Sequence, residues 1–126
     1  MKDGFEKSIP QEVQDILLAL GGEFHFDPLS SPESKAYFCG LLEGYRGDPA
    51  ETTAYLWTQV RQDFRYFEVP PAWIQKPEWP FHSGRPMYFV GQLDNTVRRD
   101  GFAYALMFYV FWDPEDGTTQ TITQSD

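Results

Sequence analysis

Residues 102–124 read FAYALMFYVFWDPEDGTTQTITQ, and this stretch decides the fold of the chain. Phe102 to Trp112 is apolar almost without interruption, which is typical of a central β-strand covered on both faces. Asp113 to Gly117 then places a proline where a type I turn prefers one and a glycine where the backbone turns left-handed. The threonine-rich segment behind the turn returns as a strand at a sheet edge. The stretch therefore predicts an antiparallel hairpin.

A further strand and an ordered loop are expected upstream of this hairpin. Met87 to Asp94 alternates with the period of a strand. One face would carry Met87, Phe89 and Leu93, and the other would carry Tyr88, Val90 and Gln92. Tyr66 to Val69 predicts a short strand, which Pro70 and Pro71 end because proline has no backbone N–H to donate. We therefore expect a loop from Pro70 to Pro86.

The N-terminal half predicts three helices, each opened by a capping signal. Ser8 caps the first helix, and Gly21-Gly22 ends it because glycine favours the backbone conformation that follows a helix. The expected bounds are Pro10 to Leu20, Ser31 to Gly44 or Gly47, and Asp48 to about Asp63. The expected buried face of the third helix consists of Ala50, Ala54, Trp57, Val60 and Phe64.

Helices followed by antiparallel strands predict an α+β fold, with the N-terminal helices packed on an antiparallel β-sheet that ends in a hairpin. At 126 residues, the chain has the size of one domain. We expect a single domain over residues 1–126, mainly helical from about 8 to 64, with a loop and antiparallel strands from about 66 to 126.

The charge of the chain restricts its partners. It has 19 acidic and 10 basic residues, which gives a net charge of −9 at pH 7. This charge repels nucleic acids and anionic membranes at long range, so neither is expected as a partner. A basic protein partner would be attracted. The same acidity also serves simply to keep an aromatic-rich protein in solution.

The expected compartment is the cytoplasm. A single cysteine, Cys39, excludes an internal disulfide, and the first 20 residues have no secretory signal pattern. No stretch of the sequence is long and apolar enough to span a bilayer.

Motifs that carry chemistry are absent from the sequence. His25 and His82 have no partner at metal-ligand spacing beyond the weak pair of His25 with Asp27, so we predict no metal site. Cys39 lies on the apolar stripe of the second predicted helix, which is typical of a structural thiol. Phosphate-binding glycine loops, dinucleotide fingerprints and nucleophile elbows are missing. We predict no catalytic residue and no cofactor, although an acid/base pair among the many carboxylates stays open.

Five residues in and beside the loop are candidate binding residues, namely Trp73, Gln75, Trp79, Gln92 and Asp94. The two tryptophans stand among prolines, so they form either a preordered aromatic platform for a partner or a cover folded back over the sheet. The two glutamines stand among apolar residues, where an amide either pins the loop or faces a ligand. We favour the structural role for both pairs.

Short motifs in the C-terminal half point to a family. They are PAWIQ at 71–75, WP at 79–80, GRPMYFVGQLD at 84–94 and FYVFWD at 108–113, with a late Gln124. In these motifs the chain resembles the YwqG-like proteins, a largely uncharacterised bacterial family. It departs from the family at Val69-Pro70, where paired glycines are usual, and it is shorter than the usual member.

This resemblance implies a protein-interaction module, since some members of the family are candidate immunity proteins that neutralise a toxin. Trp73, Gln75, Gln92 and Asp94 match the family pattern. We therefore expect a small acidic protein-binding module, with an immunity-type toxin inhibitor as its narrower form. Two alternatives stay open. One is a small-molecule-binding protein or small enzyme with a pocket between the Trp/Pro loop and the sheet, and the other is a structural subunit of a homo-oligomer.

Overall fold

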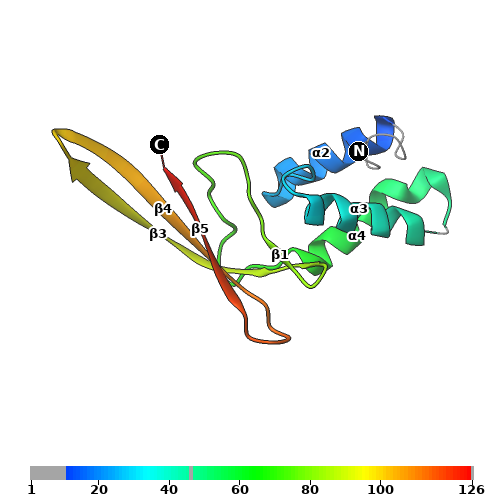
Figure 1. The fold of residues 1–126 in the computed structure, drawn as a ribbon. Coiled ribbons are helices and arrows are strands. Elements are labelled where there is room, and N and C mark those ends of the chain that lie inside the picture. Colours follow the sequence, from blue (N-terminus) through cyan, green and yellow to red (C-terminus); the bar gives the residue numbers. More distant parts are fainter. Residues whose placement is uncertain (1–10, 46, 126) are drawn as a thin grey trace.

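The computed structural model describes residues 11–45 and 47–125, and it confirms the α+β class. The helices are α2 (Gln11–Phe24), α3 (Pro32–Gly44) and α4 (Thr52–Asp63), the last preceded by the 3-10 helix η1 (Pro49–Glu51). The strands are β1 (Phe81–His82), β2 (Arg85–Pro86), β3 (Tyr88–Arg99), β4 (Phe102–Trp112) and β5 (Thr119–Ser125). Strands β3, β4 and β5 form one antiparallel sheet in that order, and β1 pairs with β2 (Figure 1).

Helix α2 is longer than predicted, because it continues through Gly21 and Gly22 to Phe24. The prediction that this glycine pair ends the helix is therefore wrong. His25 takes the left-handed conformation after the helix (φ 69°), and the Phe26 N–H donates to the Gly21 carbonyl at 3.0 Å. A Cβ at Gly21 would lie only 2.5 Å from the Phe26 carbonyl oxygen, so this glycine permits a close approach. The predicted cap Ser8 and start Pro10 lie outside the described residues.

The starts of the other two helices follow the predicted capping signals. The Ser31 side chain accepts from the Ser34 N–H at 3.1 Å, and α3 ends at Gly44, the first of the two predicted ends. Asp48 accepts from the Ala50 N–H at 2.9 Å and thereby opens η1, and α4 ends at Asp63.

The buried face of α4 differs from the prediction. Leu56, Val60 and Phe64 are buried, at the spacing of one helix face. Ala50, Ala54 and Trp57 are exposed, so their placement on the buried face is wrong. The buried face is centred on Leu56 and not on its neighbour Trp57, which lies at the border of that face and is 40% exposed.

The C-terminal hairpin is confirmed. Strand β4 spans Phe102–Trp112, β5 forms an edge, and Gly117 takes a left-handed conformation (φ 80°) in the turn between them. β4 is central in the sheet, but the prediction that it is covered on both faces is wrong. Only Tyr109 and Phe111 of this strand are buried.

Strand β3 is longer than predicted and contains a β-bulge. It continues past Asp94 to Arg99, and it turns into β4 through Asp100 and Gly101, both with positive φ. The pairing shifts between Phe89 and Gly91, which inserts Val90 as an extra residue. After the bulge, Gln92 pairs with Tyr109 and therefore shares the face of Phe89. Leu93 lies on the opposite face, so its predicted placement with Phe89 is wrong.

The predicted strand at Tyr66–Val69 is reduced to a single parallel bridge between Tyr66 and Phe89. The segment after it, predicted as a loop from Pro70 to Pro86, is irregular up to Pro80 and then forms the two-residue strands β1 and β2. In Figure 1 this loop runs between the sheet and the helices.

One hydrophobic core joins the helices to the base of the sheet. Its buried residues are Leu17, Leu20, Phe26, Phe38, Leu56, Val60, Phe64, Trp79, Met87, Phe89, Tyr109 and Phe111. The aromatic rings meet closely, for example Phe26 and Phe64 at 4.4 Å between ring centroids. None of the helices in the described part of the chain is long and apolar enough to cross a membrane.

Candidate functional site

Both tryptophans of the Trp/Pro loop use their indole N–H on the backbone of the chain itself. Trp79 is 2% exposed and donates to the Met87 carbonyl at 2.8 Å. Trp73 donates to the His25 carbonyl at 2.7 Å, and its ring lies 4.4 Å from that of Tyr109. Trp79 thus secures the end of the loop in the core, and Trp73 connects the loop to the end of α2.

The two predicted glutamines also hold the loop. Gln92 accepts from the Ala72 N–H at 2.7 Å, and Gln75 donates from its side chain to the Ser125 carbonyl at 2.5 Å. Asp94 is exposed on β3, where it pairs in register with Met107. Four of the five candidate residues, all except Asp94, therefore form hydrogen bonds that hold the loop in place.

Gln124 is the most connected polar side chain around the loop, and the sequence did not single it out as a site residue. It is 2% exposed, and its amide oxygen accepts from the Ile74 and Gln75 N–H groups at 3.1 and 3.0 Å. Its amide nitrogen donates to the Lys76 carbonyl and to Glu78, both at 2.8 Å. The signal was available, because strand alternation places Gln124 on the same face as Ile122.

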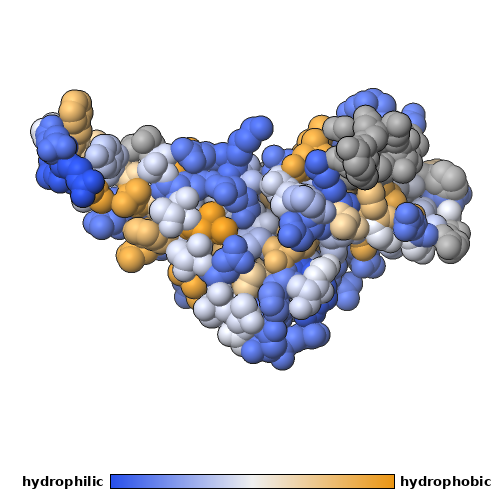
Figure 2. Space-filling view, in the orientation of Figure 1, coloured by the Kyte–Doolittle hydropathy of each residue, from blue (hydrophilic) through white to orange (hydrophobic). Residues whose placement is uncertain are grey.

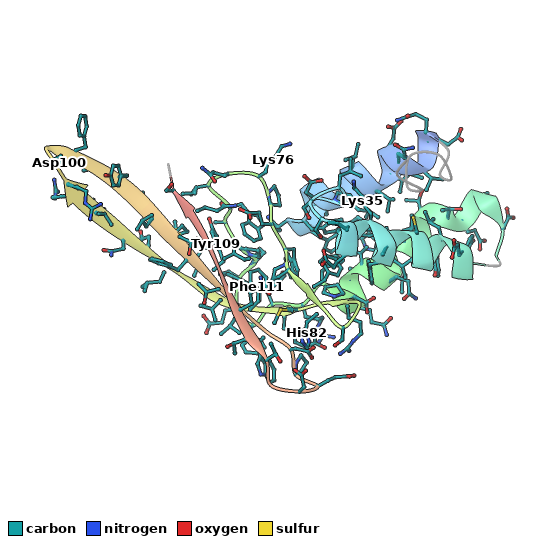
Figure 3. The ribbon with its side chains drawn as sticks, in the orientation of Figure 1. Lys35, Lys76, His82, Asp100, Tyr109 and Phe111 are labelled. Atoms are coloured by element: carbon teal, nitrogen blue, oxygen red, sulfur yellow. The ribbon has the colours of Figure 1, made fainter. Side chains whose placement is uncertain are left out.

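A charged cluster joins β1–β2 to the turn after β4. His82 Nδ1 lies 2.7 Å from buried Asp113 and 3.7 Å from Asp116. Arg85 lies 3.5 Å from Asp113 and 3.1 Å from Glu115. The Glu115 backbone N–H, followed by the hydrogen bond with His82, lowers the pKa of Asp113 below its usual range. In Figure 3 the labelled His82 lies at the side of the molecule where these hairpins meet.

This cluster has the residue types of a metal site, since one ligand atom from each of His82, Asp113 and Asp116 lies within 4.8 Å of the others. Its contacts are those of a structural ion-pair network. His82 and Asp113 already share a hydrogen bond, and the Arg85 guanidinium supplies the positive charge beside Asp113. The sequence missed it because the three residues come from two separate hairpins.

A cavity of about 280 Å³ lies between the start of α3, the loop and β5. Its lining residues are Ser30, Ser31, Glu33, Glu78, Trp79, Pro80, Phe81, Gln120 and Ile122. Trp79 alone among the five candidate residues lines it, and the Glu78 carboxylate is bonded to Gln124. Gln92 and Asp94 do not line this cavity, so the candidate residues do not converge on it as a binding site.

The sheet has two different faces. The inner face carries Phe89, Tyr109 and Phe111, which pack in the core. Register and strand alternation assign the following residues to the other face, here called the outer face. They are Tyr88, Leu93, Asn95, Val97 and Arg99 of β3, Phe102, Tyr104, Leu106, Phe108, Val110 and Trp112 of β4, and Thr119, Thr121, Thr123 and Ser125 of β5.

The outer face is apolar where an antiparallel sheet is usually polar. Every outer-face residue of β4 is aromatic or aliphatic, and none of the outer-face residues belongs to the core. Phe102 near the tip is 69% exposed and Leu93 on β3 is 66% exposed, whereas the row from Leu106 to Trp112 on β4 is half-buried on this face. Figure 2 shows hydrophobic side chains on the projecting part of the sheet, away from the helices. A contiguous apolar surface of this kind is typical of an interaction site.

The distal part of this face stands clear of the body. Strand β5 pairs with β4 only from Leu106 to Trp112, so residues 96–105 form a two-stranded ribbon. In Figure 1 this ribbon projects past β5 and away from the helices, and Figure 3 labels Asp100 at its tip. Within the described residues, the second edge of β3 is paired only through the single bridge of Tyr66 to Phe89, at the end of the strand away from the tip.

Charge is distributed unevenly between the outer face and the helices. Arg99 is the one charged residue assigned to the outer face. Residues 11–64 carry nine acidic and three basic side chains. The acidity of the chain therefore resides largely in its helical half.

No family model, curated protein or solved structure matches this chain. The resemblance to the YwqG-like proteins therefore stays a prediction from short motifs.

Proposed function

We propose that this chain is a protein-binding module and that its binding surface is the outer face of the sheet. The observation that carries the proposal is the continuous apolar row on β4, from Phe102 to Trp112, which the helices do not cover. Burying apolar surface contributes about 25 cal/mol per Å², so a partner that covers this row gains binding free energy from it.

The contacts of the Trp/Pro loop support this proposal over a ligand pocket beside the loop. Trp73, Trp79 and Gln92 direct their side-chain polar atoms to backbone groups of the chain. Residues that recognise a small ligand would instead present polar atoms to a concave space. The indoles and amides of the loop thus support a scaffold that holds the sheet against the helices.

The acidic helical half favours the approach of a basic protein, because complementary charge steers association. An immunity-type toxin inhibitor is the narrower form of the proposal that fits this charge. A basic partner bound through the helical half would dissociate as salt is raised. A partner bound through the outer face would persist, since that face has little charge.

The proposal is tested by capture from a lysate of the source cells with two matched variants. Leu93→Arg adds a charge to the outer face, and Thr96→Arg adds the same charge to the inner side of the same strand. Both positions are exposed, so neither change disturbs the core. We expect a specific protein to bind the wild type and Thr96→Arg and to be lost from Leu93→Arg. Equal capture by both variants would contradict the proposal.

A further inference from the structure

We propose that the partner of the outer face is a second copy of this chain, packed sheet to sheet. This inference rests on the proposed function, because it names the occupant of the same surface. It joins three observations, namely the shape of the face, its charge and its area.

The shape of the outer face suits a two-fold contact with itself. A row of large apolar side chains on the central strand β4 is flanked on β5 by small β-branched threonines. Two sheets pack face to face at about 10 Å when their side chains interdigitate. In a two-fold dimer the same patch serves both copies, so the apolar row of one copy packs beside that of the other.

The charge of the outer face favours a second copy over a basic protein. No carboxylate is assigned to this face, so a basic partner finds no counter-charge on it. The charges at this face are those of Arg99 and of Arg65, whose guanidinium carbon lies 5.9 Å from the centroid of the Tyr88 ring, so a second copy brings a face without carboxylates and with little charge. Depletion of charge at the centre is the compositional mark of protein interfaces.

Charges at the two ends of the face are complementary under a two-fold axis. Arg99 lies beside Asp100 at the tip of the ribbon, and the acidic turn follows the other end of β4, where Glu115 and Asp116 contact Arg85 and His82 and stay exposed. An antiparallel arrangement places the tip of each copy beside the acidic turn of the other. The pairing of opposite charges there fixes the orientation more than it adds affinity.

The area of the face is sufficient for a weak dimer. β4 has 11 residues, which at about 3.4 Å per residue gives a length of about 37 Å. With strands about 4.8 Å apart, the flat area of two such faces together is on the order of 900 Å². This figure does not include the extra surface of the protruding side chains. This area lies below the roughly 1,200–2,000 Å² of stable interfaces, in the range of weak and transient contacts, so we expect reversible association with a dissociation constant no tighter than about micromolar.

Sedimentation equilibrium of the purified full chain tests this inference at low and high sodium chloride. We expect a reversible dimer of the wild type, with Thr96→Arg within about twofold of it and Leu93→Arg weaker by about tenfold or more. Higher salt should strengthen the dimer, because each copy carries a net charge of −9 and salt screens the repulsion. Circular dichroism checks that all three proteins are folded.

Three outcomes would overturn the inference. The first is a wild type that stays monomeric at hundreds of micromolar, on the order of a hundred times the expected dissociation constant. The second is equal weakening of the dimer by Leu93→Arg and Thr96→Arg. The third is a dimer that dissociates when salt is added. If the purified chain is monomeric, but the capture from lysate still finds a protein that binds the wild type and not Leu93→Arg, then the partner is not a second copy and the proposed protein-binding function stands. If the purified chain is monomeric and capture from lysate is the same for the wild type and Leu93→Arg, both the dimer and the proposed function are contradicted. Flotation of the wild type, but not of Leu93→Arg, with phosphatidylcholine vesicles would assign the face to lipid instead.

Discussion

At the scale of single residues, Gln124 holds the irregular loop on the sheet. Its amide reaches the backbone at Ile74, Gln75 and Lys76, three consecutive residues of the loop. The Tyr109 hydroxyl lies beside it, 3.2 Å from its amide oxygen. Because the loop has almost no strand or helix to satisfy its backbone, these side-chain contacts take that role.

Substitution of this glutamine should therefore destabilise the fold. We expect Gln124→Ala to lower the free energy of unfolding by about 2–4 kcal/mol, since it removes a buried side chain together with the acceptor of the Gln75 N–H and the donor to the Lys76 carbonyl and Glu78. Urea unfolding followed by tryptophan fluorescence measures the change. Gln120→Ala is the matched control, because Gln120 is an exposed glutamine on the same strand. Its expected change is within about 0.5 kcal/mol, and equal losses in the two variants would contradict this role of Gln124.

The role of such residues was only partly visible in the sequence. Gln75 and Gln92 were favoured as residues that pin the loop, and their contacts are of that kind. Gln124 stood in a threonine-rich edge strand, where a glutamine is expected to face solvent. Strand alternation places it on the face of Ile122, but the loop that buries it lies about 50 residues away in sequence, so the alternation alone does not reveal its contacts.

At the scale of elements, the end of α2 shows a non-glycine residue in the left-handed conformation. His25 has φ 69°, and its carbonyl accepts the Trp73 indole N–H. A side chain makes this conformation costly, whereas glycine adopts it freely. The carbonyl contact does not require the imidazole.

This position predicts an ordering of stabilities. His25→Gly should be more stable than His25→Ala by about 1 kcal/mol, because both lose the imidazole and only the alanine keeps a Cβ. Thermal unfolding of the two variants measures the difference. Equal stability of the two variants would contradict the left-handed backbone conformation at position 25.

The elements themselves were largely predictable, and their faces were not. Capping residues and turn chemistry are local, so α3, the start of η1 and the β4–β5 hairpin follow from short motifs. The bulge at Val90 inserts one ordinary residue into an alternating pattern, and the faces after it exchange. Leu93 and Gln92 were consequently assigned to the wrong faces.

At the scale of the whole molecule, the apolar run of β4 is the feature that the fold leaves unexplained. A strand that is apolar on both faces predicts cover on both sides. The helices and loop cover the inner face, whereas on the outer face the chain itself contacts the end of the row through Phe67, whose ring packs edge-on against Trp112. The outer face is therefore the part of the sequence pattern that a partner would complete. Its charge-poor surface contrasts with the acidic helical half of the same chain.

Hydroxyl-radical footprinting with mass spectrometry tests the central claim most directly, because it reports which side chains a partner covers. Phe102 and Tyr104 lie on the outer face, and exposed Trp57 on α4 serves as the internal reference. We expect the oxidation of Phe102 and Tyr104 to fall as the protein concentration is raised, or when a captured partner is added, while that of Trp57 stays constant. Protection of Trp57 with Phe102 and Tyr104 still fully reactive would contradict the assignment of the outer face as the binding surface.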